Sequence, residues 1–192
     1  MRASVTEQIR QALARNHRRT VADPSLKPAG VLLVVYVKDG EPSVLLNKRT
    51  ELVEHHKGEI SFPGGSMDDA DESLLQTALR ETHEEMGIDP GEVELLGQLD
   101  DMPTISNFLI SPFVATIPYP YRFEPSEIEV AEVLEVPISH LRDEQSWRDE
   151  ARVHQGALNV SRSYVYQEHI IFGATAKILT NFLEVVGDAS SS

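Results

Sequence analysis

Residues 64–88 constrain the fold more than any other stretch of the chain. The glycine pair Gly64-Gly65 precedes an acidic loop, and the loop precedes a segment with helical periodicity. When this segment is placed on a helical wheel at about 100° per residue, an apolar stripe forms on one side. The stripe consists of Leu75, Leu79, Thr82 and Met86. Gly87 follows it and is the residue type that most often ends a helix, so the stretch predicts a turn followed by one amphipathic helix.

Three carboxylates share another face of this predicted helix, because spacings of three and four residues bring side chains together. They are Glu81, Glu84 and Glu85. Carboxylates so close repel one another, and a hard divalent cation such as Mg²⁺ or Mn²⁺ removes the repulsion while it also binds phosphate oxygens. Arg80 is placed to pair with Glu84 one turn later. We therefore predict a metal site on this face, with a solvated acidic face as the alternative.

The stretch resembles the Nudix box, whose usual form is G-x5-E-x7-R-E-U-x-E-E-x-G-U, where U is an aliphatic residue. The second half of the box matches at Glu72, Arg80, Glu81, Glu84, Glu85, Gly87 and Ile88. Six residues, not five, separate Gly65 from Glu72, and Thr82 stands at the first aliphatic position. Either Asp71 fills the early acidic position, or the loop carries one extra residue.

The segment before the box resembles a second pattern, LLTxR[ST]-x3-R-x3-G-x3-FPGG, of the coenzyme A pyrophosphatase branch of that family. The matching residues are Leu45, Leu46, Arg49, Thr50, Gly58, Phe62, Pro63, Gly64 and Gly65. Asn47 replaces the threonine of the pattern, and Glu54 stands where its second arginine would be. The opposite charge at Glu54 bears on the choice of substrate and not on the type of reaction.

The resemblance covers about residues 28–187 and implies an α/β fold, the Nudix-type α/β/α sandwich with a mixed β-sheet. It implies metal-dependent hydrolysis of the diphosphate of coenzyme A or its derivatives. The products would be 4′-phosphopantetheine, or its acyl form, and adenosine 3′,5′-bisphosphate. ADP-ribose or another nucleoside diphosphate-linked compound is the alternative substrate. A catalytically silent module that binds a nucleotide is the alternative class.

The same resemblance implies roles for individual residues. The expected metal ligands are Glu81, Glu84, Glu85 and a carbonyl near Gly65. Glu84, Glu85 and Glu129 are the candidates for the general base, and Arg80 supports them. The substrate-binding residues are expected to be Lys48, Arg49, Lys57 and Ser61, the first three because they are cations near the metal site in an acidic protein. His55 and His56 are either exposed, bonded to substrate, or ligands.

The composition narrows the class of protein. The chain has 192 residues, a formal net charge of −14 and a pI of about 4.8. An acidic protein is a poor non-specific partner for nucleic acid or an anionic membrane, so we expect neither as a partner. With no cysteine, a disulfide, a thiolate nucleophile and a zinc–thiolate site are excluded. No long apolar run occurs near the N-terminus, which predicts a cytoplasmic protein without a membrane span.

We predict three regions, namely an N-terminal basic helical arm (1–27), a Nudix hydrolase domain (28–187) and a disordered tail (188–192). The arm carries six basic and two acidic residues, a net charge of +4. It is expected to fold back on the acidic body, pair with a second subunit, or contact phosphate. An aromatic segment at residues 119–123 faces either the substrate or a second subunit. These two features together predict a homodimer.

Periodicity predicts the remaining elements. A helix is expected at about residues 4–18, where Ser4 and Glu7 form a capping-box pattern. Apolar runs predict strands at 30–37, 44–48, 93–99 and 108–117, and shorter ones near 164–166 and 170–172. Gly173 opens a terminal helix. Its apolar stripe consists of Ala176, Leu179, Leu183 and Val186.

Overall fold

A computed structural model describes residues 4–52, 57–154 and 157–187 of the chain. The helices are α1 (Val5–Arg15), α2 (Leu74–Met86), the 3₁₀ turn η1 (Pro90–Glu92), α3 (Ile138–Arg142) and α4 (Gly173–Val186). The strands are β1 (Lys27–Lys38), β2 (Glu41–Arg49), β3 (Ile60–Ser61), β4 (Gly64–Ser66), β5 (Glu94–Gln98), β6 (Met102–Pro103), β7 (Phe108–Thr116), β8 (Val130–Pro137), β9 (Trp147–His154), β10 (Ala157–Tyr166) and β11 (His169–Ile171). The predicted tail and the first three residues lie outside the described residues.

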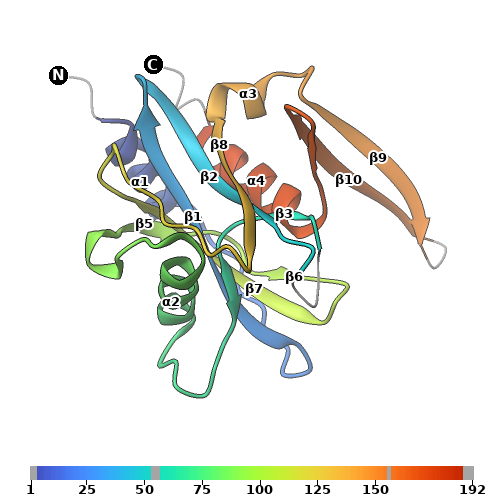
Figure 1. Cartoon of the computed structure of the whole chain (residues 1–192). Coiled ribbons are helices and arrows are strands. Elements are labelled where there is room, and N and C mark those ends of the chain that lie inside the picture. Colours follow the sequence, from blue (N-terminus) through green and yellow to red (C-terminus); the bar gives the residue numbers. More distant parts are fainter. Residues whose placement is uncertain (1–3, 53–56, 155–156, 188–192) are drawn as a thin grey trace.

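The main sheet is mixed and joins strands β1 to β8 (Figure 1). β1 is its central strand, because it pairs antiparallel with β2 on one edge and parallel with β7 on the other. β8 extends the sheet beyond β2, and β5 extends it beyond β7. A second, three-stranded sheet is formed by β9, β10 and β11. In Figure 1 the long β9–β10 hairpin extends away from the main sheet.

The β1–β2 hairpin is paired only near its turn, from Val35 opposite Val44 to Lys38 opposite Glu41. Further from the turn, residues 60–66 take up the facing edges of both strands, since β3 pairs with β2 and β4 pairs with β1. The outer edges of β1 and β2 are already occupied there by β7 and β8. Residues 60–66 therefore lie between the two strands, and we call them the wedge. The wedge brings the glycine pair to the middle of the sheet.

Helices cover both faces of the main sheet, as the alternation of side chains along β1 shows. Leu33 and Val35 pack in a core with α1 and α4, whereas Leu32, Val34 and Tyr36 pack in a second core with α2. Each β1 side chain named here is at most 1% exposed. The structure thus confirms the predicted α/β class with a mixed sheet between helices.

The basic N-terminal segment folds back on the acidic body, one of the three arrangements expected for it. Ser4 caps α1 by accepting a hydrogen bond from the Glu7 amide, and the helix ends at Arg15, earlier than predicted. Two apolar side chains of α1, Ile9 and Leu13, are buried in the core. Beyond the helix, Arg19 donates to Asp100 through both its amide (3.0 Å) and its guanidinium (2.8 Å).

The aromatic segment 119–123 packs on its own chain. The Tyr119 ring stacks on the buried Tyr36 ring with centroids 4.9 Å apart, and Phe123 lies 6.2 Å from the same ring. The Tyr121 hydroxyl donates to Glu92 over 2.7 Å. These rings therefore complete the core on the α2 face, and the homodimer stays a prediction. In the described ranges, no helix combines the length and apolarity needed to cross a bilayer.

Candidate active site

Helix α2 forms where the sequence predicts it, but its buried side differs from the predicted stripe. Ser73 caps its start, and Gly87 ends it in the left-handed region, with a φ of 69°. The predicted stripe holds for Thr82 and Met86, whereas Leu75 and Leu79 are only partly buried. The three carboxylates lie three and four residues apart in this helix, as predicted, but they are buried to different extents. Their side chains are 20%, 55% and 3% exposed at Glu81, Glu84 and Glu85 respectively.

Glu85 points from α2 into the sheet, at the point where the wedge separates β1 from β2. Its Oε2 accepts hydrogen bonds from Asn47 Nδ2 (3.1 Å) and from the Gly64 amide (3.2 Å). Its Oε1 pairs with Arg49 Nη1 at 3.2 Å. A buried carboxylate is tolerated only with such partners. The three donors come from β2 and from the wedge, so the carboxylate is held only when both have folded around α2.

Burial raises the pKa of the Glu85 carboxyl to about 7. The Arg49 guanidinium and the Gly64 amide act in the opposite direction, because both stabilise the charged form. The negative charges of Glu81 and Glu129 raise this pKa further. Glu85 is thus a buried carboxylate whose charge is only partly compensated by the protein.

Glu81 lies against the glycine pair. A Cβ built on Gly65 would lie 2.6 Å from Glu81 Cδ and 2.7 Å from each of its oxygens, so only glycine leaves room for this carboxylate. Arg80 Nη1 pairs with Glu81 Oε1 at 2.8 Å. Burial raises the pKa of Glu81 against the effect of Arg80, and Glu84 and Glu129 add to the rise.

Arg80 makes its strongest contacts with Asp71. Its Nε and Nη2 donate to the two Asp71 oxygens over 3.1 and 2.9 Å, whereas its distance to Glu84 is 3.5 Å. The Asp71 side chain also accepts hydrogen bonds from the Thr77 hydroxyl (2.9 Å) and the Asp68 amide (3.0 Å). Asp71 therefore fills the early acidic position of the motif, which decides between the two alternatives that the spacing left open.

We expect Asp71→Asn to lower the thermal midpoint of unfolding by several degrees, and Glu72→Gln to leave it unchanged. The Arg80 guanidinium holds the pKa of Asp71 well below its usual range. The ionised Asp71 side chain therefore stabilises the folded state above the unfolded-state pKa of about 4. This stabilisation is lost as the pH falls from there toward the lower pKa of the folded state. Midpoints measured by circular dichroism between pH 7 and pH 3 test both points. A Glu72→Gln loss equal to that of Asp71→Asn would contradict the assignment.

Glu129 is brought to the site by the segment that precedes β8. The Ser126 amide donates to the Glu85 carbonyl over 2.9 Å, and the Glu129 amide donates to Ser126 over 3.1 Å. Thr50, directly after β2, holds the same segment, because its amide donates to the Glu129 carbonyl (3.0 Å) and its hydroxyl donates to the Ile128 carbonyl. These contacts explain why the charge of Glu129 acts on both Glu81 and Glu85.

A family model of the NUDIX domain matches residues 26–159, which include every element that builds this site. The chain belongs to the Nudix family. It is 34% identical over 158 residues to the "Uncharacterized Nudix hydrolase NudL" of Photorhabdus laumondii, covering 82% of this chain and 84% of that relative. It is 36% identical over 162 residues to the protein of the same name from Yersinia enterocolitica, covering 82% and 80% of the two chains.

Two solved structures are similar to this chain in fold. The protein DR0079 from Deinococcus radiodurans superposes with a TM-score of 0.54 at 10% identity, covering 83% of this chain and 86% of that one. A MutT/nudix family protein from Enterococcus faecalis gives a TM-score of 0.52 at 12% identity, covering 97% and 81%. At these identities the comparison concerns the fold alone.

The residues predicted to bind substrate are only partly brought together at the Nudix carboxylates. Arg49 and Ser61 lie beside Glu85, one directly and the other through Asn47. Because Asn47 and Arg49 both contact Glu85, strand alternation directs the intervening Lys48 to the opposite face of β2. Lys57 is exposed in the loop before the wedge. His55, His56 and Glu54 lie outside the described residues.

The donor set fits a hard divalent cation. It consists of carboxylate oxygens, which are ligands that Mg²⁺ and Mn²⁺ prefer. Burial raises the pKa values of Glu81 and Glu85 and neighbouring carboxylates add to the rise, so a bound cation would stabilise their charged forms. Within the described part of the chain, no three acidic or histidine side chains are already arranged to hold a metal ion. Arg80 and Arg49 instead engage Glu81 and Glu85.

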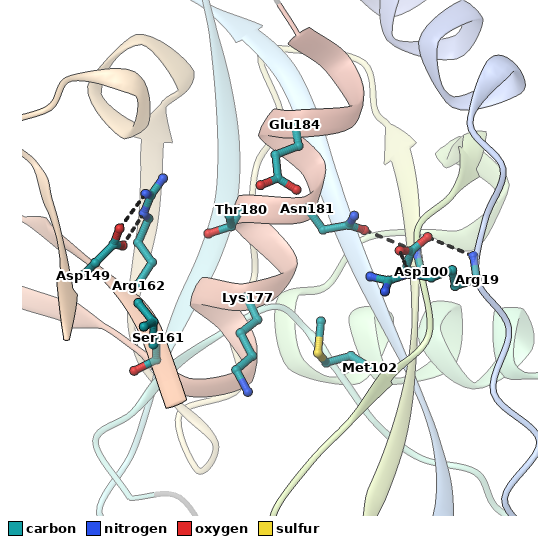
Figure 2. A pocket seen from close by; sticks show the side chains of 11 residues that line it. Arg19, Asp100, Met102, Asp149, Ser161, Arg162, Lys177, Thr180, Asn181 and Glu184 are labelled. Atoms are coloured by element: carbon teal, nitrogen blue, oxygen red, sulfur yellow. Dashed lines mark hydrogen bonds and ion pairs between the residues drawn. The ribbon is translucent and has the colours of Figure 1, made fainter. Parts of the chain in front are cut away.

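A hollow of about 290 Å³ lies elsewhere, beside α4. Figure 2 shows Arg162 bonded to Asp149 on one side and Arg19 near Asp100 on the other. Of the residues that line it, none belongs to the carboxylate group around Glu85. Two of its three lining cations are paired with these acids, and the third, Lys177, is matched by Glu184 in the lining, so the hollow has no net positive charge for a phosphorylated substrate.

Three site residues were not identified as such from the sequence. Asn47 was noted only as a departure from the coenzyme A pattern, yet it contacts Glu85. Asp71 was one of two alternatives for its position. Thr50 was read as part of a motif, whereas the structure gives it the task of anchoring residues 128 and 129. A polar residue within an apolar strand, as at Asn47, is the signal that could have indicated such a role.

Proposed function

We propose that this protein is a Mg²⁺- or Mn²⁺-dependent hydrolase that cleaves the diphosphate of coenzyme A or its derivatives. Water attacks one phosphorus, the bridging P–O bond breaks, and two phosphate monoesters leave. The observation that carries the proposal is the position of Glu85, a buried carboxylate held by three donors beside Glu81 and Glu129. A solvated acidic helix face would not bury such a group.

Glu81, Glu84 and Glu85 would hold the metal, together with a carbonyl of the glycine pair next to Glu81. When bound, the metal supplies charge neutralisation at the phosphate oxygens and activates water for attack. Among the carboxylates, Glu84 and Glu129 are less buried than Glu85, so they are the better placed to accept a proton from water. Arg80 and Asp71 keep Glu81 in place through the ion pairs described above.

Coenzyme A is proposed as substrate because residues 45–65 match the coenzyme A pattern at most positions. The substrate carries a 3′-phosphate in addition to its diphosphate, and this group needs cations in a chain of net charge −14. Lys57 is an exposed cation in the same segment and does not contact Glu85, so it is the candidate for this contact. Glu54 has the opposite sign, which favours a substrate without a 3′-phosphate as the competing possibility.

The test compares kcat/KM for coenzyme A, 3′-dephospho-coenzyme A, ADP-ribose, NADH and diadenosine polyphosphates with Mg²⁺. We expect coenzyme A to be cleaved in preference to its dephospho form. Equal or better cleavage of the dephospho form or of ADP-ribose would overturn the substrate but keep the reaction. Failure to cleave any of these compounds, with nucleotide still bound, would favour the silent binding module.

We expect Lys57→Ala to raise KM for coenzyme A about ten- to a hundredfold, because a charge-assisted phosphate contact contributes roughly 1.5–3 kcal/mol. KM for dephospho-coenzyme A should stay unchanged, since that compound lacks the phosphate in question. Steady-state kinetics on both compounds give the comparison. Arg49 is a poor choice for this test, because its removal would also disturb Glu85. An equal rise in KM for both compounds would show that Lys57 contacts a part of the substrate other than the 3′-phosphate.

A further inference from the structure

We propose that Asn47 is the positioning residue that determines which oxygen of Glu85 receives the metal ion, and that Ser61 orients the Asn47 amide for this task. The inference rests on the proposed function, since it requires Glu85 to be a metal ligand. It concerns a residue that differs from the threonine of the resembling pattern.

The hydrogen bonds around Asn47 leave it one orientation. Its side chain is on the α2 face of β2, and the residue is 1% exposed. Ionised Glu85 can only accept hydrogen bonds, so the Asn47 NH₂ group must face it, at 3.1 Å. The Asn47 carbonyl oxygen then accepts the Ser61 hydroxyl over 2.8 Å. Ser61 is paired with Asn47 across β2 and β3, so the wedge itself fixes the amide.

These contacts make the two oxygens of Glu85 unequal. A carboxylate oxygen offers about two lone-pair sites. Oε2 uses both, for Asn47 and for the Gly64 amide, whereas Oε1 uses one, for Arg49 Nη1. Among the contacts that the described residues make, only Oε1 therefore keeps a free site for a cation. Asn47 and Gly64 hold Oε2 toward the sheet, and this leaves Oε1 as the oxygen that is available to the metal.

The test measures Mn²⁺ binding directly, by electron paramagnetic resonance of free Mn²⁺ in titrations of the whole protein without substrate. Asn47→Val and Asn47→Thr are compared, because valine and threonine have nearly the same shape and differ by the hydroxyl donor. We expect Asn47→Val to raise the Kd for Mn²⁺ about 10- to 100-fold, the usual effect of losing a partner of a metal ligand. Asn47→Thr should retain most of the affinity. At saturating Mn²⁺, KM for the substrate should be unchanged in both.

Two controls separate this inference from the proposed function. Glu85→Gln removes the ligand itself, so unaltered Mn²⁺ binding in that variant would contradict the proposed site and not only the role of Asn47. Tyr164→Phe removes a buried hydroxyl bonded to Thr180 at 2.8 Å, remote from Glu85, and should leave the Kd unchanged. If Glu85→Gln weakens binding while Asn47→Val binds as the wild type does, the inference is overturned. Equal weakening in the valine and threonine variants would also overturn it, by assigning the loss to packing.

Discussion

Glu81→Gln and Glu85→Gln are each expected to lower kcat about 10²–10⁴-fold, the range for losing a principal electrostatic or acid–base group in a catalytic site. Glutamine keeps the shape of each side chain and removes its charge. At Glu81, the glutamine oxygen can still accept the Arg80 hydrogen bond. At residue 85, the glutamine oxygen can still accept the hydrogen bonds from Asn47 and Gly64. The contact with Arg49 is lost, because the glutamine NH₂ group replaces the oxygen that accepted it.

Glu72→Gln is the matched control for these two variants, since Glu72 is exposed and its carboxylate makes no hydrogen bond or ion pair to the described residues. Its kcat should equal that of the wild type. Circular dichroism confirms that each variant is folded before rates are compared. Near-normal turnover by both Glu81→Gln and Glu85→Gln at limiting metal would show that the α2 carboxylates are not the site.

Removal of divalent metal is expected to abolish hydrolysis, and addition of Mg²⁺ or Mn²⁺ to restore it. The reason is the excess negative charge around Glu81, Glu85 and Glu129, which in the described residues is met only in part by Arg49 and Arg80. A phosphorylated substrate brings further negative charge to this region. The measurement is product release in chelator, followed by titration of the metal. Full activity in excess chelator would contradict the mechanism.

A second readout of the same prediction does not depend on turnover. A ligand that binds only the folded state at one hundred times its Kd stabilises it by about 2.7 kcal/mol. In a chain of this size such a gain raises the thermal midpoint by roughly 5–10 °C. We expect this rise with Mg²⁺ in the wild type and a much smaller one in Glu85→Gln. An equal rise in both would place the bound metal elsewhere on the protein.

The sequence was most informative where periodicity and motif agreed. The helix itself followed from its apolar spacing and its end from Gly87, and the structure confirms both. The wheel could not show which side of the helix the sheet would cover, because that depends on packing between distant strands. For this reason the sequence does not predict the burial of Glu85.

Loop and strand geometry account for the other differences. Asp71 and Glu72 are adjacent acids, and only the fold shows which one reaches Arg80. Strand alternation in β2 was available from the sequence and would have separated Lys48 from Arg49. Glu129 lies close enough to Glu81 and Glu85 to affect their pKa values because Ser126 and Thr50 hold its segment in place. No local sequence pattern predicts these contacts. Its role as base stays a prediction.

The position of the wedge bears on when the carboxylate site is assembled during folding. The groups around Glu85 come from β2, from residues 60–66 and from α2, and none of these carries them alone. The wedge in turn has its strand partners only in β1 and β2. A partly folded chain therefore has no assembled carboxylate site, and metal cannot nucleate its folding as zinc does in small finger domains. The metal affinity proposed for this protein would therefore report completion of the sheet.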